Sequence, residues 1–265
     1  MGFFDAVELL SAGCLAGFLS GFFGVEGGLT LVPALLYLYH SEGVSSLVST
    51  QLTIGTSLLV TTCAELVPAW RMWKQKHVLL RALGFGCIGC AIGALGAGAW
   101  AGSAQGDVLR KLVAGAMFLA VIRLLSGSGK GDREPQLTGP GLMAMGLIGG
   151  CQTSLTGVDG SGLTSSLMNM FLHVPQKKAA GTSKAIAIVG TTAATAVYIQ
   201  CGWGNEFAPG GTLGFVDWVR AIPLAIGLIP ASLAGVALST RGLNKNLRRT
   251  FAIVLLVIVV RLLVL

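Results

Sequence analysis

The sequence predicts an all-α polytopic membrane protein made of two inverted repeats, each a broken or re-entrant helix pair followed by three transmembrane helices. Of its 265 residues, 53% are hydrophobic and only 11% are charged, against about 25% charged in an ordinary globular domain. The apolar residues gather in long segments, and two of these carry similar glycine-rich interruptions. Too little charge remains to cover a soluble surface, so a water-soluble enzyme is excluded.

The apolar segments are of two kinds. Six have the length of an ordinary span, about 20 residues: 44–70, 78–101, 107–126, 178–201, 216–239 and 246–265. The other two, 5–39 and 138–173, are about 35 residues long, and as continuous helices they would run ~52 Å against a ~30 Å hydrocarbon core. Each is interrupted by glycines, at 24–28 and 157–162. We therefore expect two half-helices joined by unwound backbone in each.

The two interruptions resemble each other, which indicates an internal duplication. Both read Gly-Val-acid-Gly followed by Gly-Leu-Thr, and a Gly-Thr-Ser triplet opens the apolar part of the next helix in each case, at 55–57 and 181–183. The predicted units are a first transmembrane repeat, 1–126, and a second, 138–265. A polar, glycine-rich stretch, 127–137, has the composition of a linker and is predicted to be cytoplasmic.

Basic loops set the expected orientation. The segments 71–81 and 240–249 each hold four Lys or Arg residues and no acid, so both should be cytoplasmic. That requires one long segment between them to return without crossing, and 138–173 is the best candidate for a re-entrant hairpin. By the repeat, 5–39 is also a hairpin, and the odd number of crossings inverts the second half, as in many secondary transporters. The alternative is a kinked full crossing for each long segment, and Arg110 and Lys111 in a loop predicted outside are the weak point of the hairpin prediction.

Unwound backbone inside a bilayer is tolerated only where it is buried in protein or lines a watery cavity. Half-helix N-termini offer N–H groups and a positive dipole end, and glycine allows close approach, which suits a small oxyanion. The interruptions therefore predict a shared midplane site. The alternative is that the glycines only let helices pack and that the hydroxyls bond their own helices. The predicted substrate-binding residues are Gly24, Gly27, Gly28, Thr56, Ser57, Gly160, Ser161, Gly162, Thr182, Ser183 and Lys184.

Two charged residues lie in these interruptions, and a third, Lys184, directly follows the second Gly-Thr-Ser triplet. Glu26 and Asp159 occupy matching places, and a charge at membrane depth is a functional hypothesis by default. They are interpreted as proton carriers for coupling, with two alternatives: pairing with a buried cation, or capping of the next half-helix. Lys184 is interpreted as an anion ligand, with pairing to Asp159 and snorkelling to the cytoplasmic boundary as alternatives. Glu65, near Arg71, is expected to be interfacial.

Other chemistry has little support in the sequence. Cys87 and Cys90 form a C-x-x-C within a glycine-rich stretch, interpreted as a packing face, with a thiol relay or membrane-embedded enzyme as the rival. The three histidines lie at segment ends without metal-ligand spacing, and no nucleophile elbow, phosphate loop or zinc-protease motif occurs. We expect no metal, no cofactor and no nucleic-acid partner, because the net charge of +7 sits in short loops.

The glycine pattern resembles the sulfite exporter TauE/SafE family of membrane transporters. The residues that carry the resemblance are Gly17-x-x-Ser20-Gly21-x-x-Gly24-x-x-Gly27-Gly28-x-x-x-x-Pro33, Gly55-Thr56-Ser57, Gly157 to Gly162 and Gly181-Thr182-Ser183. The resemblance implies export of a small sulfur-containing anion, such as sulfite or a sulfonate, across the bacterial inner membrane by a multi-pass protein driven by an ion gradient. The chain departs from the family pattern at Glu26, Asp159 and Lys184, where small or apolar residues are usual. These departures leave open a bulkier or more highly charged anion and built-in proton coupling.

The expected partners are therefore a small anionic substrate, the lipid bilayer and protons, and an oligomer is compatible with the sequence. Two rival functions stay open at this point. An anion channel would conduct down-gradient far faster than a carrier. A cation transporter would use Glu26 and Asp159 as its ligands.

Overall fold

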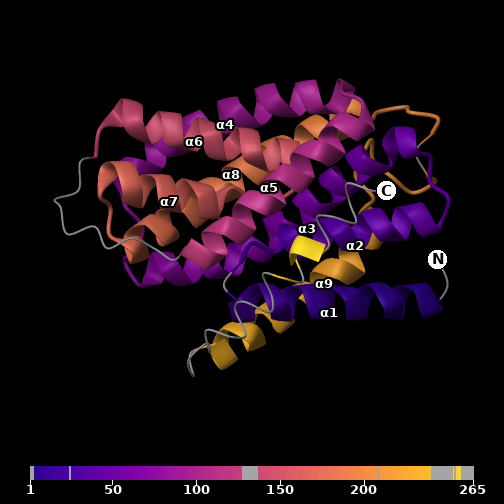
Figure 1. The fold of residues 1–265 in the computed structure, drawn as a ribbon, viewed down its shortest axis with the longest axis horizontal. Helices are drawn as coiled ribbons and strands as arrows, with labels where there is room; N and C mark the ends of the chain where they lie inside the picture. The colour runs from indigo at the N-terminus through magenta and orange to yellow at the C-terminus, as the bar shows by residue number, and fades with distance from the viewer. Residues whose placement is uncertain are drawn as a thin grey trace.

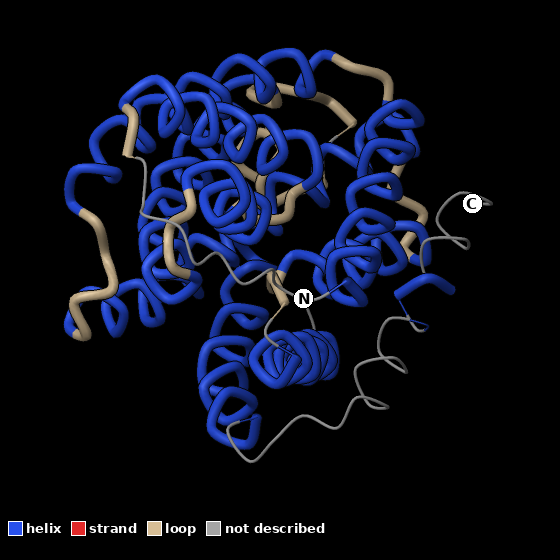
Figure 2. Tube along the Cα trace, turned by 60° about the vertical axis from the view of Figure 1, so that its left-hand side comes forward, coloured by secondary structure: helices blue, strands red, loops and turns tan. Residues whose placement is uncertain are grey.

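The computed structural model describes residues 3–23, 25–126, 137–207, 209–239, 253 and 255–257, and the regular elements in this part of the chain are α-helices (Figures 1 and 2). The prediction of an all-α polytopic protein is confirmed. The helices, in chain order, are α1 (Phe3–Phe23), α2 (Gly28–Ser41), α3 (Ser46–Lys74), α4 (Leu80–Ser103), α5 (Gly106–Ser126), α6 (Gly139–Thr156), α7 (Ser161–Leu172), α8 (Gln176–Cys201) and α9 (Trp218–Ser239).

Both long apolar segments are broken where the glycines predicted, and each folds back as a helical hairpin. In the second, α6 ends because Gly157 takes a left-handed conformation, with φ of +70°, which glycine adopts without strain. Residues then pair in reverse order: a Cβ at Gly149 would lie 2.1 Å from Thr164 Oγ1, and one at Gly141 would lie 3.1 Å from Leu172. The second segment is therefore a hairpin and not a kinked crossing.

The first hairpin follows the same plan with a longer first arm. The Thr30 hydroxyl on α2 reaches back to the carbonyl oxygen of Ala16 on α1, at 3.4 Å. Its α1 arm has 21 residues, or about 31 Å of helix, so it is long enough to cross a membrane alone. This differs from the short half-helix expected, because the break lies past the middle of the segment and leaves 21 residues in α1 against 14 in α2.

Helices α1 and α9 run parallel in close contact along the lower edge of Figure 1. A Cβ at Gly13 would lie 2.4 Å from the carbonyl oxygen of Leu224, and one at Gly17 would lie 2.2 Å from that of Leu228. These distances are below any allowed contact, so only glycine permits the backbones to approach this closely. Both residue numbers rise together, which fixes the parallel direction.

Helices α4 and α6 form a second parallel contact of the same kind, at the top of Figure 1. A Cβ at Gly89 would lie 2.0 Å from the carbonyl oxygen of Met143, and one at Gly93 would lie 2.3 Å from that of Leu147. We call the two contacts the α1–α9 seam (Gly13, Gly17, Gly21, Gly227 and Gly235) and the α4–α6 seam (Gly86, Gly89, Gly93, Gly146 and Gly150). Each seam joins the first arm of one hairpin to a helix of the other half of the chain.

Between the seams, α3 and α8 pack antiparallel, because Lys184 contacts Glu65 while Tyr198 lies against Gly55. Their buried faces are unusually polar for membrane helices: on α3 the hydroxyls of Thr53, Ser57 and Thr61 lie at most 1% exposed. Most of these hydroxyls donate to a carbonyl one turn earlier on their own helix, as Thr53 and Thr61 do. Polar groups are therefore concentrated at the centre of the bundle, and these hydroxyls are satisfied by backbone carbonyls.

Positive charge collects at one end of the bundle. The loop after α3 contacts the start of α8, where a Cβ at Gly181 would lie 2.7 Å from the carbonyl oxygen of His77. This contact brings the basic segment 71–81 together with Lys177 and Lys178, and the positive-inside rule predicts that this end faces the cytoplasm. The other basic segment, 240–249, and linker residues 127–136 lie outside the described residues.

Five described helices are long and apolar enough to cross a membrane: α1, α3, α4, α8 and α9. Helix α5, expected as an ordinary span, is not among them; Asp107, Arg110 and Lys111 lie in its first turns and Arg123 lies near its end. Arg110 pairs with Asp107 at 3.6 Å, and the acid offsets part of the positive charge at the N-terminal end of α5. Most of the last predicted span, 246–265, lies outside the described residues, although Leu255 is helical and buried in the core.

Candidate functional site

The tips of the two hairpins meet in the middle of the bundle. A Cβ at Gly28 would lie 2.7 Å from both the carbonyl oxygen of Gly157 and the Cα of Val158. The Ser57 hydroxyl on α3 donates to the same Gly157 carbonyl at 2.8 Å. Two glycine-rich breaks more than a hundred residues apart therefore touch, as a shared site requires. Gly24, another predicted site residue, lies outside the described residues.

An ion pair between α3 and α8 lies within electrostatic range of the acids at this junction. The Lys184 ammonium donates to both carboxylate oxygens of Glu65, at 2.8 and 3.0 Å. The Glu65 residue is only 7% exposed, and the Lys184 side chain is 27% exposed. The interfacial placement expected for Glu65 is wrong, and the direct partner of Lys184 is Glu65 and not Asp159.

Two more carboxylates act on the same ammonium. Lys184 interacts electrostatically with Asp159 in the second break and with Glu26 in the first. Each hairpin tip therefore carries an acid within electrostatic range of the same cation. When all four groups are ionised, the cluster of Glu26, Glu65, Asp159 and Lys184 carries one positive and three negative charges.

Asp159 is fully buried and only partly satisfied. Its Oδ1 accepts the N–H of Ser161 at 3.0 Å, the helix-capping contact anticipated as an alternative. Its Oδ2 is buried without a hydrogen-bond partner among the described residues. Capping therefore explains one oxygen and leaves the other available to a proton or a ligand.

Other polar groups of the second break are occupied by the protein itself. The Gly160 N–H donates to Thr153 Oγ1 at 2.9 Å, so two of the first N–H groups of α7, those of Gly160 and Ser161, already have acceptors. Gly162 follows on α7, half-buried. In the first break, Gly27 is buried, and a Cβ there would make ordinary contacts, the nearest with Ser20 Oγ at 3.7 Å. Backbone donors for an anion are therefore scarcer at α7 than the glycine pattern suggested.

The two Gly-Thr-Ser triplets dock equivalent segments. Thr56 accepts the N–H of Asp217, just before α9, at 3.0 Å. Thr182 accepts the N–H of Leu79, just before α4, also at 3.0 Å. Each threonine therefore anchors the start of a helix from the other half of the chain, and each preceding glycine lets that segment approach. Ser183, buried on α8, donates to the carbonyl of Ala180 on its own helix at 3.1 Å.

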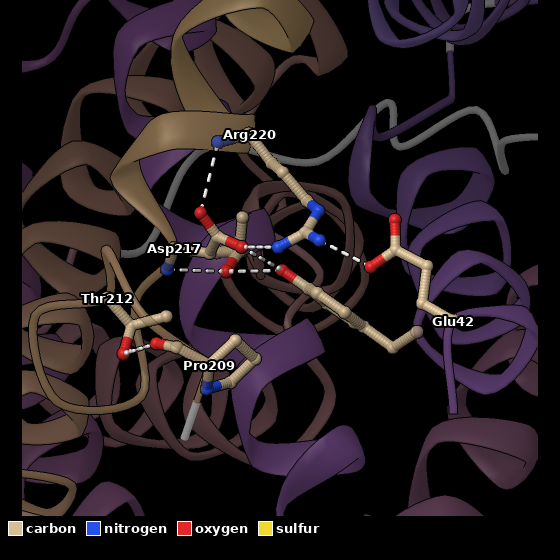
Figure 3. Close-up of polar contacts among 7 residues, drawn as sticks. Glu42, Pro209, Thr212, Asp217 and Arg220 are labelled. Atoms are coloured by element: carbon tan, nitrogen blue, oxygen red, sulfur yellow. Dashed lines mark hydrogen bonds and ion pairs between the residues drawn. The ribbon is translucent and has the colours of Figure 1, made fainter. Parts of the chain in front are cut away.

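A second polar cluster, which the sequence did not reveal, lies at the end opposite the basic loops (Figure 3). The Arg220 guanidinium lies between the carboxylates of Asp217 and Glu42 and pairs with both. The Tyr39 hydroxyl donates to Asp217 Oδ2 at 3.3 Å and lies 3.4 Å from Thr56 Oγ1. This cluster ties α2, α3 and α9 together. The only signal for this cluster in the sequence was the position of Asp217 three residues before Arg220.

Cys87 and Cys90, the C-x-x-C pair of the sequence, lie one turn apart on α4. Cys90 is buried in the α4–α6 seam, where a Cβ at Gly150 would lie 2.1 Å from its carbonyl oxygen. Cys87 is half-buried one turn earlier, and both are free thiols. Among the described residues, no group of three or more His, Cys, Asp or Glu side chains is placed to hold a metal ion.

A bundle of apolar helices, with two hairpins whose tips meet beside buried charges, is the architecture of a polytopic membrane transporter. Residues 9–262 match the family described as Sulfite exporter TauE/SafE, so the chain belongs to the sulfite exporter TauE/SafE family. The resemblance in the glycine motifs is thereby confirmed.

Three relatives carry the name probable membrane transporter protein. The protein from Haemophilus influenzae is 25% identical over 257 residues, covering 95% of each chain. The protein from Bacillus subtilis is 26% identical, covering 95% of this chain and 97% of its own. The protein from Methanocaldococcus jannaschii is 23% identical, covering 91% of this chain and 88% of its own. The chain is therefore a multi-pass membrane transporter, which in a bacterium lies in the inner membrane.

Proposed function

We propose that this protein is a secondary transporter that exports a small sulfur-containing anion, such as sulfite, a sulfonate or a related organosulfur acid, with protons as the coupling ion. The observation that carries the proposal is Lys184, whose ammonium interacts with the acids of both hairpin tips and whose side chain is 27% exposed. A lysine at membrane depth is costly unless it serves an anion or a charge partner, and the exposed part of this side chain is open to an anion.

The binding site is proposed to lie at the hairpin junction. Lys184 supplies the charge, and Ser57, Ser183, Ser161 and the backbone at Gly27 and Gly28 line the approach. Glycine at the tips keeps side-chain bulk out of the space between them. Thr56 and Thr182 support this site indirectly, by holding the helices that carry it.

Alternating access is proposed to use two inverted repeats, 1–126 and 138–265, joined by the cytoplasmic linker 127–137. Three pairs of equivalent contacts support this. The α1–α9 seam corresponds to the α4–α6 seam, the docking contact of Thr56 corresponds to that of Thr182, and the two hairpins meet tip to tip. Rocking of one repeat against the other about this centre would expose the site to each side in turn.

Proton coupling is proposed to run through Asp159 and Glu26. Both act on Lys184, and Asp159 has a buried oxygen without a partner among the described residues. The same excess of carboxylates favours a second candidate, a cation transporter in which Glu26 and Asp159 are ligands.

The test is flux of isotopically labelled sulfite and methanesulfonate into proteoliposomes, with and without an imposed pH gradient. Saturable, gradient-dependent flux is expected in the wild type and in the control Lys177→Met, which removes an exposed lysine two turns earlier on α8. Flux should be lost in Lys184→Met. Flux that ignores the pH gradient overturns proton coupling. Absence of anion flux, with cation flux that survives Lys184→Met and fails in Asp159→Asn, replaces the proposal by the second candidate.

A further inference from the structure

We propose that Glu65 is a built-in competitor for the transported anion: it occupies Lys184 in the empty transporter and gives it up by taking a proton when the anion binds. This inference rests on the proposed function, because it assumes that Lys184 is the anion ligand. It assigns a positioning role to a residue outside the glycine motifs, on a helix that neither hairpin includes.

The Glu65 carboxylate occupies the N–H donors of Lys184 that a bound anion would also use. The Glu65 carboxylate presents two oxygens to Lys184 Nζ, at 2.8 and 3.0 Å. Sulfite and sulfonates also present oxygens bonded to a single central atom, so they can take the same two N–H donors. A third N–H of the ammonium remains, but an anion held by it alone would share the cation with Glu65. Full binding therefore requires Glu65 to leave.

Because Glu65 is buried, its carboxylate is unfavourable in the ionised form once it is displaced from Lys184. The residue is 7% exposed on the inner face of α3, and the charged groups that act on it are Lys184 from α8 and Asp159 from the second hairpin tip. Glu26, from the first tip, acts on Lys184. An ionised Glu65 displaced by an anion would be a buried charge without a partner, facing another acid, which is strongly unfavourable.

Protonation removes that difficulty and balances the step. One water-borne proton adds to the Glu65 carboxylate, one monovalent anion binds to Lys184, and the net charge of the site stays the same. No bond in the anion breaks, and no electron is transferred. Because the empty site returns with Glu65 ionised and paired to Lys184, one proton and one anion cross in the same direction, so export proceeds while the outward gradient of the anion exceeds the inward gradient of protons.

The test measures proton uptake on binding, with the purified full-length protein in weakly buffered detergent solution and a pH-indicator dye. Methanesulfonate is the probe, because its charge does not change near neutral pH. The wild type should take up about one proton per bound anion, as the exchange requires. Glu65→Gln should take up about one proton fewer per bound anion, and at neutral pH it should bind the anion about tenfold more tightly, because a charge-assisted competitor is gone.

Two further variants separate Glu65 from a general effect of acids. Glu65→Asp keeps a titratable carboxylate and should keep proton uptake, which also shows that the position tolerates substitution. Asp107→Asn removes an exposed acid on α5 and should behave as the wild type. Unchanged proton uptake in a folded Glu65→Gln that still transports the anion overturns this inference and leaves the proposed function intact. A folded wild type that neither binds nor transports methanesulfonate or sulfite overturns the proposed function, and the inference with it.

Discussion

The α4–α6 seam predicts opposite effects for two alanine substitutions three residues apart on α4. A methyl group at Gly93 would lie 2.3 Å from the carbonyl oxygen of Leu147 and 3.1 Å from the amide nitrogen of Cys151. A methyl group at Gly96 has no neighbour within 4 Å. Both substitutions gain the same helix propensity, about 1 kcal/mol, so the difference between the two variants isolates the packing cost.

Ordinary contact begins at 3.4 Å, so α6 must retreat by about 1 Å to admit the Gly93 methyl. Overpacking of this kind costs ~1–3 kcal/mol, or roughly 2–12 °C in unfolding temperature for a chain of this size. The assay is retention of the monodisperse size-exclusion peak after stepwise heating in detergent. Gly93→Ala should unfold below Gly96→Ala by that interval, and Gly96→Ala at or slightly above the wild type. Equal unfolding temperatures for the two variants would refute the close backbone approach in the seam.

The remaining predictions concern the charged pairs and the second hairpin tip. Lys184→Met should lower the unfolding free energy by ~3–5 kcal/mol, because it leaves the buried Glu65 carboxylate without its cation. The double variant with Glu65→Leu should recover most of that loss in the same heating assay. A double variant no more stable than the single one would contradict the ion pair. Arg220→Gln should cost a similar ~3–5 kcal/mol by leaving a buried acid without its cation, whereas Arg110→Gln, in an exposed pair, should cost at most about 1 kcal/mol; equal losses would mean that the outer cluster of Figure 3 is not a buried network. Gly157→Ala should destabilise the folded protein by more than about 1 kcal/mol, because φ there is +70°. It should also slow anion flux per folded molecule, and wild-type flux would show that the tip geometry is not needed for transport.

The broken helices were predictable because two independent signals coincide at each of them. Length against membrane thickness requires a break, and glycine places it within a few residues, as Gly28 and Gly157 show. The return of the second hairpin was also predicted from loop charge, since the basic segments 71–81 and 240–249 were expected on one side, and the repeat extended the prediction to the first hairpin. These are local or one-dimensional properties that sequence carries directly.

The ion pair was not predictable, because pairing partners are a three-dimensional property. Glu65 and Lys184 are 119 residues apart, and Arg71, six residues from Glu65, suggested a local explanation for the acid. The rule that acids within apolar segments are functional applied to Glu65 as much as to Glu26 and would have marked it. The threonines of the Gly-Thr-Ser triplets were assigned to the site from their motif, yet Thr56 and Thr182 have a docking contact that only the packing of distant loops reveals.

The α1–α9 seam has a consequence for how the protein is made. Helix α1 leaves the ribosome first, and its partner, α9, follows about 200 residues later, which at ~5–20 residues per second is roughly 10–40 s. During that interval the groove at Gly13, Gly17 and Gly21 faces lipid, an insertase or the wrong helix. Synthesis of the last third of the chain therefore decides whether the first helix finds its place, and truncations before α9 should leave α1 open to degradation by membrane proteases even though its own sequence is intact.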